Sequence, residues 1–415
     1  MHEMLVKANA IREQIVADRR CLHGMPEVGV YTPRTAAYVK KRLGEMGICH
    51  RDCGVHKPED REKMVFAGYP DAPAATGVVG LIGRGGPCIL LRADMDGLPM
   101  EETTGLDFAA EGRAAHCLPT FQENDFLLGW QHAEGTYRFC HHTPEDEIDA
   151  QMAEYNKYYE MDTDNIDSVR YQAREEVAIK KFLDKEGFGA FHTNFEDLQG
   201  LRQLPGLASQ DLMRQGYGFG AEGDWKVAAM TRIMKQMAEG LQGGTAFMED
   251  YTYHFEPGNE MLLGSHMLEV CPTVAANKPK IQVHPLGIGD REDPARLVFK
   301  AQTGNAIVVT LVDMGDRLRM IVNDVECKEQ VNEMPKLPVA GVLWKPLPCL
   351  QTSAEAWIYA GGAHHSVLSY SLTAEHMRDF AEIMGIEFVY INKDTEINSF
   401  RKELFYNDVA YKLGM

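Results

Sequence analysis

The stretch AFMEDYTYHF (residues 246–255) alternates in a way that predicts a β-strand. Alternation along a strand puts Glu249 on an aromatic face. The two faces are Phe247, Glu249, Tyr251, Tyr253 and Phe255 on one side, and Met248, Asp250, Thr252 and His254 on the other. A carboxylate on the aromatic face costs several kcal/mol unless it is protonated, hydrogen-bonded or bound to a cation. A glutamate satisfied by an arginine or by the neighbouring tyrosine hydroxyl groups is the structural alternative.

Downstream of this stretch the sequence is rich in β signals. Residues 295–325 contain three alternating or β-branched runs separated by turn residues, as in a meander. A loop-rich tail follows, with one helix at residues 373–384 and a short strand at 386–392. We therefore expect a β-rich, barrel-like C-terminal domain over residues 246–415.

Upstream, the chain is α/β in character. Long charged helices are predicted at residues 144–161 and 168–187, and a further helix follows the glycine-spaced GYGFGAEG. These segments define a central α/β region over residues 143–245. Residues 1–117 are also α/β, with helices at 5–22 and 35–46 and strands at 77–83 and 88–96 joined by RGGP. Residues 118–142 follow neither the helical period nor the alternation of a strand, and we expect them to form a poorly packed junction.

The composition is that of an ordinary globular protein: 45% hydrophobic and 25% charged over 415 residues. The net charge of −19 argues against nucleic acid or an anionic membrane as a partner, and favours a small neutral or cationic substrate. The sequence shows neither a secretory signal nor an apolar run long enough to span a bilayer, which predicts a cytoplasmic protein. Nine cysteines without a CxxC pair indicate neither a disulfide framework nor a structural zinc.

Several polar residues are candidates for a metal site. Glu222 precedes a predicted helix, where a capping acid is the commoner reading. His266 lies in a short apolar segment and is equally compatible with a hydrogen-bonded core histidine. In AGGAHHSV, an extended chain points His364 and His365 to opposite sides, so that at most one reaches a given metal, and a surface pair is the alternative. With Glu249, two carboxylates and two imidazoles form a set suited to Mn²⁺, Co²⁺ or Fe²⁺.

A second acidic group lies near the amino terminus. Asp94 and Asp96 end a predicted strand, and Glu101 and Glu102 follow within a few residues. Acids at the end of a strand are plausible metal ligands or bases, and a solvated turn is the structural alternative. The pair His116 and Cys117 looks like the opening of a metal site, but LPTFQEND follows, so we interpret the pair as a boundary between segments.

From about residue 142 to the end, long stretches resemble the C-terminal part of bacterial L-arabinose isomerases. They are residues 195–226, GLQGGTAFMEDYTYHFEPGN (240–259), LLGSHMLEVCP (262–272), LGIGDREDPARLVF (286–299) and EAWIYAGGAHHSV (355–367). The resemblance implies that the manganese ligands of the family fall on Glu222, Glu249, His266 and His365, and that Phe195 lines the sugar pocket. It also implies that the central region is part of a Rossmann-like domain.

The implied activity is the interconversion of L-arabinose and L-ribulose, with D-galactose to D-tagatose as a side activity. Carboxylates would move a proton between C1 and C2 through a cis-enediol, and Glu222 and Glu249 are the acid/base pair that the resemblance favours. The N-terminal Rossmann-like domain through which the family builds its oligomers does not match this sequence. A homo-oligomer stays open as a prediction.

Residues 1–117 instead resemble the start of aminoacylase-like metallopeptidases that hydrolyse N-acyl amino acids. The matching stretches are residues 17–48 and 89–117, after which that family's first metal ligands do not follow. We interpret this part as a truncated α/β hydrolase-like segment. The alternatives to an isomerase are therefore an N-acyl-amino-acid amidohydrolase and a catalytically impaired fusion that keeps only a metal-binding shell.

Overall fold

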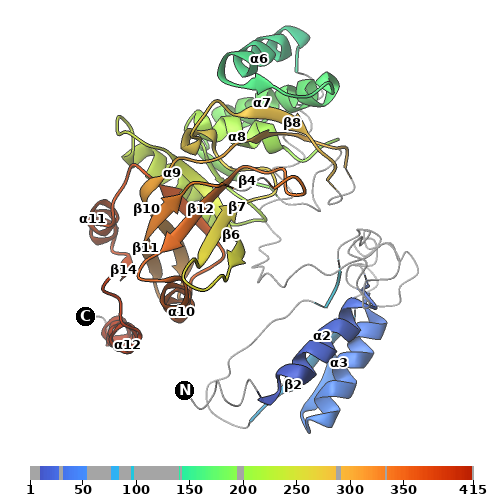
Figure 1. Cartoon of the computed structure of the whole chain (residues 1–415), viewed down its shortest axis with the longest axis vertical. Coiled ribbons are helices and arrows are strands. Elements are labelled where there is room, and N and C mark those ends of the chain that lie inside the picture. Colours follow the sequence, from blue (N-terminus) through green and yellow to red (C-terminus); the bar gives the residue numbers. More distant parts are fainter. Residues whose placement is uncertain are drawn as a thin grey trace. The chain divides into compact units, whose positions relative to one another are not determined.

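A computed structural model describes residues 10–27, 31–53, 76–83, 95–97, 140, 143–193, 201–286, 291–331 and 334–413 (Figure 1). The chain divides into two compact units, Met1–Phe121 and Gln122–Met415. The described helices include none that combines the length and the apolarity needed to cross a membrane.

The described residues of the first unit form two helices and a two-stranded antiparallel sheet. Helix α3 starts with a proline, which suits the first helical position because its missing N–H has no partner there in any case. The predicted strand at 77–83 is β2, and it pairs with β1. The predicted strand at 88–96 lies outside the described residues except for Met95 and Asp96. The elements are α2 (Arg12–His23), α3 (Pro33–Glu45), β1 (Cys49–Cys53) and β2 (Gly77–Leu81).

The second unit starts with a helical layer. Helix α7 is capped by Asn165 and ends at Gly187, whose φ of 76° is the left-handed conformation that glycine adopts without strain, as the sequence predicts for this position. The elements of this layer are α6 (Glu145–Tyr158), β3 (Glu160–Met161), α7 (Ile166–Glu186), β4 (Ala190–His192), α8 (Gly206–Arg214), β5 (Gly218–Gly220) and α9 (Trp225–Met237).

Glycines bring helix α9 unusually close to strand β5, which pairs in parallel with β4. A Cβ atom at Gly218 would lie 2.2 Å from the carbonyl oxygen of Ala228, and one at Gly220 would lie 2.3 Å from that of Asp224. Both positions therefore require glycine. This close packing explains the glycine spacing of GYGFGAEG and fixes the loop between β5 and α9 against the sheet.

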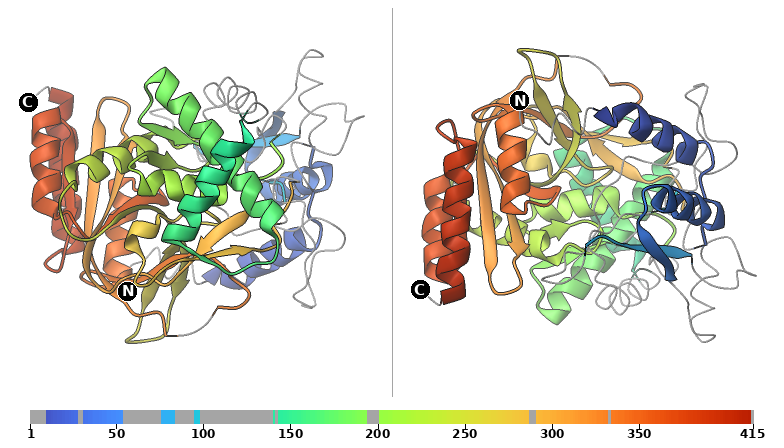
Figure 2. Two further views of the ribbon diagram at one scale, coloured as in Figure 1. Left: turned by 90° about the horizontal axis from the view of Figure 1, so that it is seen from above. Right: turned by 90° about the horizontal axis from the view of Figure 1, so that it is seen from below.

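The C-terminal part is a closed β-barrel, as predicted. Its strands follow the order β10-β13-β6-β7-β12-β11, and a further pairing of β10 with β11 closes the ring, with β14 added in parallel to β11 (Figures 1 and 2). The strands are β6 (Thr245–His254), β7 (Met261–Ser265), β10 (Gly304–Asp313), β11 (Leu318–Lys328), β12 (Gly341–Pro346), β13 (His365–Ser369) and β14 (Glu387–Ile391).

The meander predicted over 295–325 is only half correct. Strands β10 and β11 form a long antiparallel hairpin, but β9 (Ala295–Val298) turns away and pairs with β8 (Lys280–Val283) in a separate sheet with β3. The reason is that Ala295, Arg296 and Leu297 are buried against the helical layer, where the main-chain N–H and carbonyl of Leu297 bond the buried Gln210. The short 3-10 helix Pro272–Val274 lies between β7 and β8.

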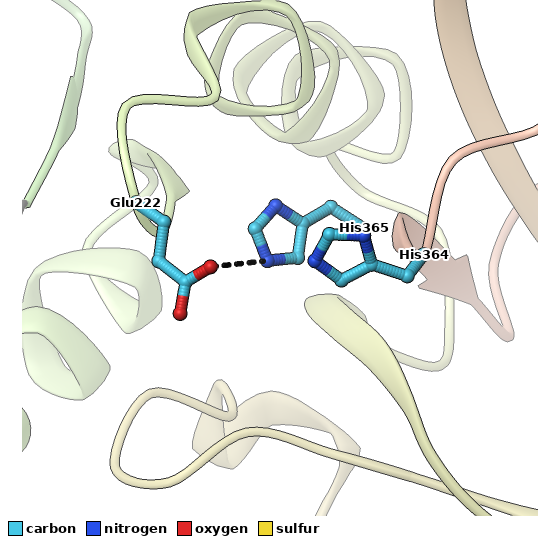
Figure 3. A group of neighbouring side chains, drawn as sticks. All are labelled: Glu222, His364 and His365. Carbon is cyan, nitrogen blue, oxygen red and sulfur yellow. Dashed lines mark ion pairs between the residues drawn. The ribbon is translucent and has the colours of Figure 1, made fainter. Parts of the chain in front are cut away.

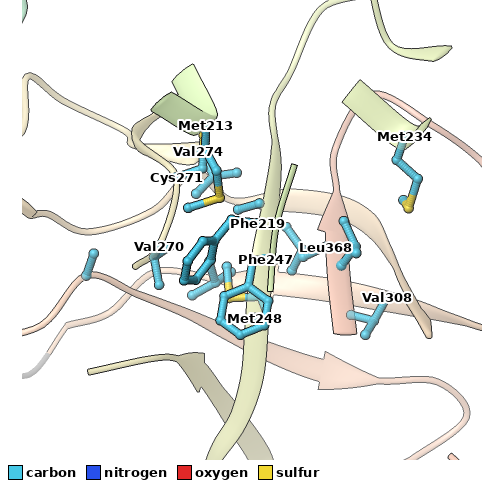
Figure 4. Packing of buried hydrophobic residues seen from close by; sticks show 14 of the residues in the cluster. Met213, Phe219, Met234, Phe247, Met248, Val270, Cys271, Val274, Val308 and Leu368 are labelled. Atoms are coloured by element: carbon cyan, nitrogen blue, oxygen red, sulfur yellow. The ribbon is translucent and has the colours of Figure 1, made fainter. Parts of the chain in front are cut away.

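One apolar core joins the helical layer to the barrel (Figure 4). Phe219 of β5 meets Phe247 of β6 edge to face, with ring centroids 5.3 Å apart. Both rings are fully buried, together with Met213, Met234 and Met248. The two parts therefore form one packed body, and the loop before α9 and the strands of the barrel have fixed positions relative to each other.

The tail is less loop-rich than predicted, because it contains two helices that the sequence did not reveal. These are α10 (Leu350–Ala360) and α12 (Ile397–Leu413), in addition to the expected α11 (Ala374–Met384). Helix α12 is held by a buried charge network in which Arg319 bonds Glu387, at 2.9 Å, and Asp408, at 3.0 Å. Apolar residues occupy both faces of α12, so its sequence shows no clear amphipathic period.

Candidate metal centre

The barrel places two of the candidate residues in one row. Glu249 of β6 lies directly opposite His365 of β13 on one side and opposite Ser265 of β7 on the other. His266 follows Ser265 at the end of β7. Three residues that are distant in the sequence thus meet because their strands are neighbours in the sheet.

Glu222 approaches the same place from the loop between β5 and α9. Its φ of 57° is the left-handed conformation, and among the residues that the structure describes it is the one non-glycine with a positive φ. Such a conformation costs a glutamate about 1–2 kcal/mol and is typical of functional sites. The helix cap suspected at Glu222 is in fact Asp224, whose side chain accepts a hydrogen bond from the amide of Val227.

His365 is held between two carboxylates. Its Nδ1 lies 3.3 Å from Oδ2 of Asp224, and its Nε2 lies 3.9 Å from Oε2 of Glu222. The second distance is too long for a hydrogen bond. The imidazole is buried, and its Nε2 has no hydrogen-bond partner in the described part of the chain. Asp224 thus fixes the ring and leaves Nε2 directed toward Glu222.

His266 repeats this arrangement on the neighbouring strand. Its Nδ1 lies 2.5 Å from Oε2 of Glu269, and its Nε2 lies 3.9 Å from Oε2 of Glu249. Metal-binding histidines commonly direct the other ring nitrogen to a carboxylate, which sets the tautomer and the ring orientation. Both histidines of the predicted set have this partner.

His364 also faces the site, contrary to the expectation that the two histidines diverge. The His364 and His365 rings have centroids 4.1 Å apart, and both approach Glu222 (Figure 3). One ligand atom from each of Glu222, His364 and His365 lies within 4.8 Å of the others. The physical reason is that β13 begins only at His365, so His364 is not part of an extended pair. His364 is thus a further candidate ligand.

The alternation expected along β6 holds only as far as Glu249. The register of the pairing with β7 shifts between Asp250 and Thr252, as at a β-bulge. Beyond it the strand leaves the core, and Tyr253 and Phe255 are exposed. The aromatic face is therefore not continuously buried, whereas Glu249 itself is largely buried and Phe247 packs against both His266 and His365.

The electrostatics favour a bound cation. Burial raises the pKa of Glu249. Burial lowers the pKa of His266, but the carboxylates of Glu269, Glu249 and Glu222 outweigh this and raise it to about 9. Burial and the neighbouring His365 lower the pKa of His364 to about 3, so its ring is neutral and retains a lone pair. The carboxylates that raise the pKa of His266 would favour a divalent ion in the same way, and the neutral ring of His364 can offer it a nitrogen lone pair.

Two orienting residues were missed in the sequence, Asp224 and Glu269. Asp224 directly precedes a predicted helix, which is an N-cap signal, and Glu269 follows His266 by three residues. Neither signal points to a metal. Of the other candidates, Asp94, Glu101, Glu102, His116, Cys117 and Phe195 lie outside the described residues. Asp96 is described and belongs to the first unit.

Comparisons with known proteins cover most of the second unit. Residues 133–240 match the L-arabinose isomerase central domain, and residues 244–387 match the L-arabinose isomerase C-terminal domain. Both matches start beyond residue 117, so the hydrolase-like reading of residues 1–117 stays a prediction.

Individual relatives agree with these matches. L-arabinose isomerase 1 of Bacillus licheniformis is 57% identical over 271 residues, which are 65% of this chain and 55% of that protein. L-arabinose isomerase of Clostridium beijerinckii is 56% identical over 269 residues, with the same shares. That of Geobacillus stearothermophilus is 59% identical over 246 residues, which are 59% of this chain and 49% of that protein. The chain spans about half the length of the curated relatives it matches.

Proposed function

Because residues 133–387 carry the central and C-terminal domains of the L-arabinose isomerase family, we propose that this chain interconverts L-arabinose and L-ribulose. The observation that carries the proposal is the convergence of Glu222, Glu249, His266 and His365, of which Glu249 and His365 lie on paired strands, His266 directly follows β7, and Glu222 lies in the loop before α9. Conversion of D-galactose to D-tagatose is proposed as a second activity of the same site.

We further propose that these four residues hold Mn²⁺, with Co²⁺ or Fe²⁺ as substitutes. The donor set, the partnerless Nε2 of His365 and the carboxylates behind both histidines support this choice. When bound, the ion supplies Lewis-acid polarisation of the sugar carbonyl. Asp224 and Glu269 keep Nε2 of each imidazole directed into the site.

The proton transfer is assigned to the two glutamates. Isomerisation removes a proton from C2 of the aldose and delivers it to C1, while a second proton moves between O1 and O2. Glu249 is suited to accept the carbon-bound proton, because its burial raises its pKa toward the range in which a carboxylate is an effective base. Glu222, which approaches the site from the loop before α9, is proposed as its partner in the transfer through a cis-enediol.

The test is to incubate the full chain with L-arabinose and Mn²⁺ and to measure the ketose formed. Glu249→Gln keeps the shape of the side chain and should lower kcat by at least about 100-fold. Glu256→Gln changes an exposed carboxylate just beyond the same strand and should leave the rate unchanged. Wild-type activity in the Glu249→Gln variant would disprove the acid/base assignment.

A chain that binds Mn²⁺ but forms no ketose would instead be a metal-binding shell without turnover. Release of an amino acid from an N-acyl substrate would support the hydrolase alternative, which the described residues do not favour. The cytoplasmic location expected from the sequence stays a prediction.

A further inference from the structure

A buried arginine contacts the segment that carries His266. Arg296 of β9 is 3% exposed, so its guanidinium charge lies almost entirely out of water. Its Nη2 donates to the carbonyl oxygen of His284 at 2.9 Å, and its Nη1 makes a longer contact of 3.5 Å with that of Met267. Its Nε has no hydrogen-bond partner in the described part of the chain. Carbonyl oxygens carry no net charge, so these bonds alone do not neutralise the guanidinium.

Glu269 is the carboxylate that compensates this charge. Burial lowers the pKa of Arg296, and the carboxylate of Glu269 opposes this shift more strongly than that of Asp293 does. The Glu269 side chain is 1% exposed, whereas Asp293 is exposed, and water screens an exposed charge far more than a buried one. Removing the arginine therefore affects Glu269 most, because it leaves a buried carboxylate with less compensation.

The segment 266–270 and strand β9 are held together by a second buried side chain. The amide nitrogen of Gln210 in α8 donates to the carbonyl oxygens of Val270, at 2.9 Å, and Leu297, at 3.2 Å. Its oxygen accepts a hydrogen bond of 2.7 Å from the main-chain amide of Leu297. The departure of β9 from the expected meander thus has a use, because it brings the guanidinium of Arg296 to this segment.

The two carboxylates that orient the histidines differ in how their charge is stabilised. Asp224 caps helix α9, whose N-terminal amides and dipole favour an anion, and its side chain is 15% exposed. Glu269 lies outside the described helices and strands, is more deeply buried, and accepts a main-chain hydrogen bond from Leu268 at 3.1 Å. A buried carboxylate without a helix N-terminus depends more on a neighbouring cation. Arg296 provides at Glu269 the positive charge that the start of α9 provides at Asp224.

We propose that Arg296 is a positioning residue of the metal site, which holds the carboxylate of Glu269 against Nδ1 of His266. This role rests on the proposed function, because it concerns the ion that His266 is assigned to bind. Without the arginine, Glu269 is destabilised in its buried position, and the imidazole loses the partner that directs Nε2 into the site. Arg296 acts through Glu269 and His266 and not as a ligand.

The test measures the Mn²⁺ affinity of the full chain from the paramagnetic resonance of free Mn²⁺, which does not depend on turnover. Arg296→Met removes the charge at similar side-chain length and should raise the dissociation constant about tenfold. Arg296→Lys retains a cation and should recover most of that loss. When Glu269→Gln has already removed the carboxylate charge, Arg296→Met should change the dissociation constant by less than about threefold.

Two matched variants control for other effects of these substitutions. Asp293→Asn removes the exposed carboxylate near Arg296 and should leave the Mn²⁺ affinity unchanged. Arg232→Met removes a half-buried arginine of α9 that bonds the main-chain carbonyl of Gly216, and it should also leave this affinity unchanged. Circular dichroism and thermal unfolding show whether each variant keeps its fold.

A crystal structure of the metal-free Arg296→Met variant gives a readout that does not depend on the ion. The distance from Nδ1 of His266 to Oε2 of Glu269, which is 2.5 Å in the present structure, should exceed the range of a hydrogen bond. An unchanged distance would overturn the proposal, as would equal losses of affinity with and without Glu269→Gln.

Failure of the proposed activity is distinguishable from failure of this role. A wild-type chain that binds Mn²⁺ but forms no ketose would disprove the activity, and the affinities of the variants would still decide the role of Arg296. A wild-type chain that does not bind Mn²⁺ would overturn the metal site and this role together.

Discussion

His365 and Glu249 lie directly opposite each other on neighbouring antiparallel strands of the barrel. One row of the sheet thus fixes an imidazole beside the carboxylate proposed as the base, and Phe247 packs against the rings of both histidines of the set. The site depends on main-chain pairing within the barrel for its spacing and on buried carboxylates for the orientation of its histidines. The following variants separate these contributions.

Replacing Asp224 with asparagine should weaken metal binding without weakening the fold. Asparagine caps a helix as well as aspartate does, so α9 keeps its hydrogen bond to Val227. The loss of charge removes the anchor of Nδ1 in His365, and we expect Mn²⁺ affinity to fall about 10–100-fold. Calorimetric titration measures the Mn²⁺ affinity, and thermal unfolding shows whether the variant keeps its fold. An unchanged Mn²⁺ affinity would contradict the orienting role of Asp224.

Two substitutions of Glu222 should differ in stability and agree in function. Glycine adopts a φ of 57° without strain, whereas alanine keeps the strain. We expect the free energy of unfolding of Glu222→Gly to exceed that of Glu222→Ala by about 1 kcal/mol, as measured by urea denaturation. Both variants should lose Mn²⁺ binding. Equal stabilities would show that the conformation of this residue costs nothing.

Glu176 should make the fold less stable at higher pH. It is fully buried beside Asp211, and burial followed by the charge of Asp211 raises its pKa well above the ordinary value. Because the folded pKa exceeds the unfolded one, its stabilising contribution is complete below the unfolded pKa and is lost as pH rises toward the folded pKa. Glu176→Gln mimics the protonated acid, so it should match the wild type near pH 4 and exceed it at pH 8.

The measurement is the free energy of unfolding at both pH values, with an expected difference of at least about 1 kcal/mol at pH 8. Glu154→Gln, on the exposed side of α6, serves as the control and should leave the profile unchanged. A difference between wild type and Glu176→Gln that stays constant with pH would argue against this account.

Arg319→Ala should destabilise the C-terminal part of the barrel by about 3 kcal/mol, because it leaves Glu387 buried with less compensation. The guanidinium also bonds the carbonyl oxygen of Ala360, which links α10 to the network. Arg202→Ala removes an exposed pair with Glu292 and should cost less than about 1 kcal/mol. Chemical denaturation measures the free energy of unfolding of both variants and so compares the buried pair with the exposed one. Equal losses of free energy of unfolding would contradict a stabilising role of the buried network.

Alternation in the sequence predicts β6, β10, β11 and β14, whereas β7, β12 and β13 were not predicted because they lie in short apolar or loop-like segments without a clear alternation. The sequence also indicates Glu222, Glu249, His266 and His365 through the combination of residue types and a family resemblance. The role of Asp224 was not predictable, since the imidazole that it contacts is distant in the sequence. Glu269 lies only three residues from His266, but residue spacing outside a regular helix or strand does not show that the two side chains meet. The position of His364 depends on the residue at which β13 begins, and the irregularity at Tyr251 depends on its partner strand.

The closure of the barrel has a consequence for the order of events in folding. The pairing of β6 with β13, which brings His365 to Glu249, spans about a hundred residues of chain, whereas β6–β7 and β10–β11 are hairpins of consecutive strands. Pairings between distant segments pay a large loop entropy before any contact rewards them, and they form late. Glu249 and His266 can therefore approach each other as soon as β6 and β7 form their hairpin, whereas His365 joins them only when β13 pairs with β6. A divalent ion added early meets an incomplete set of ligands, and only the finished barrel presents the whole set.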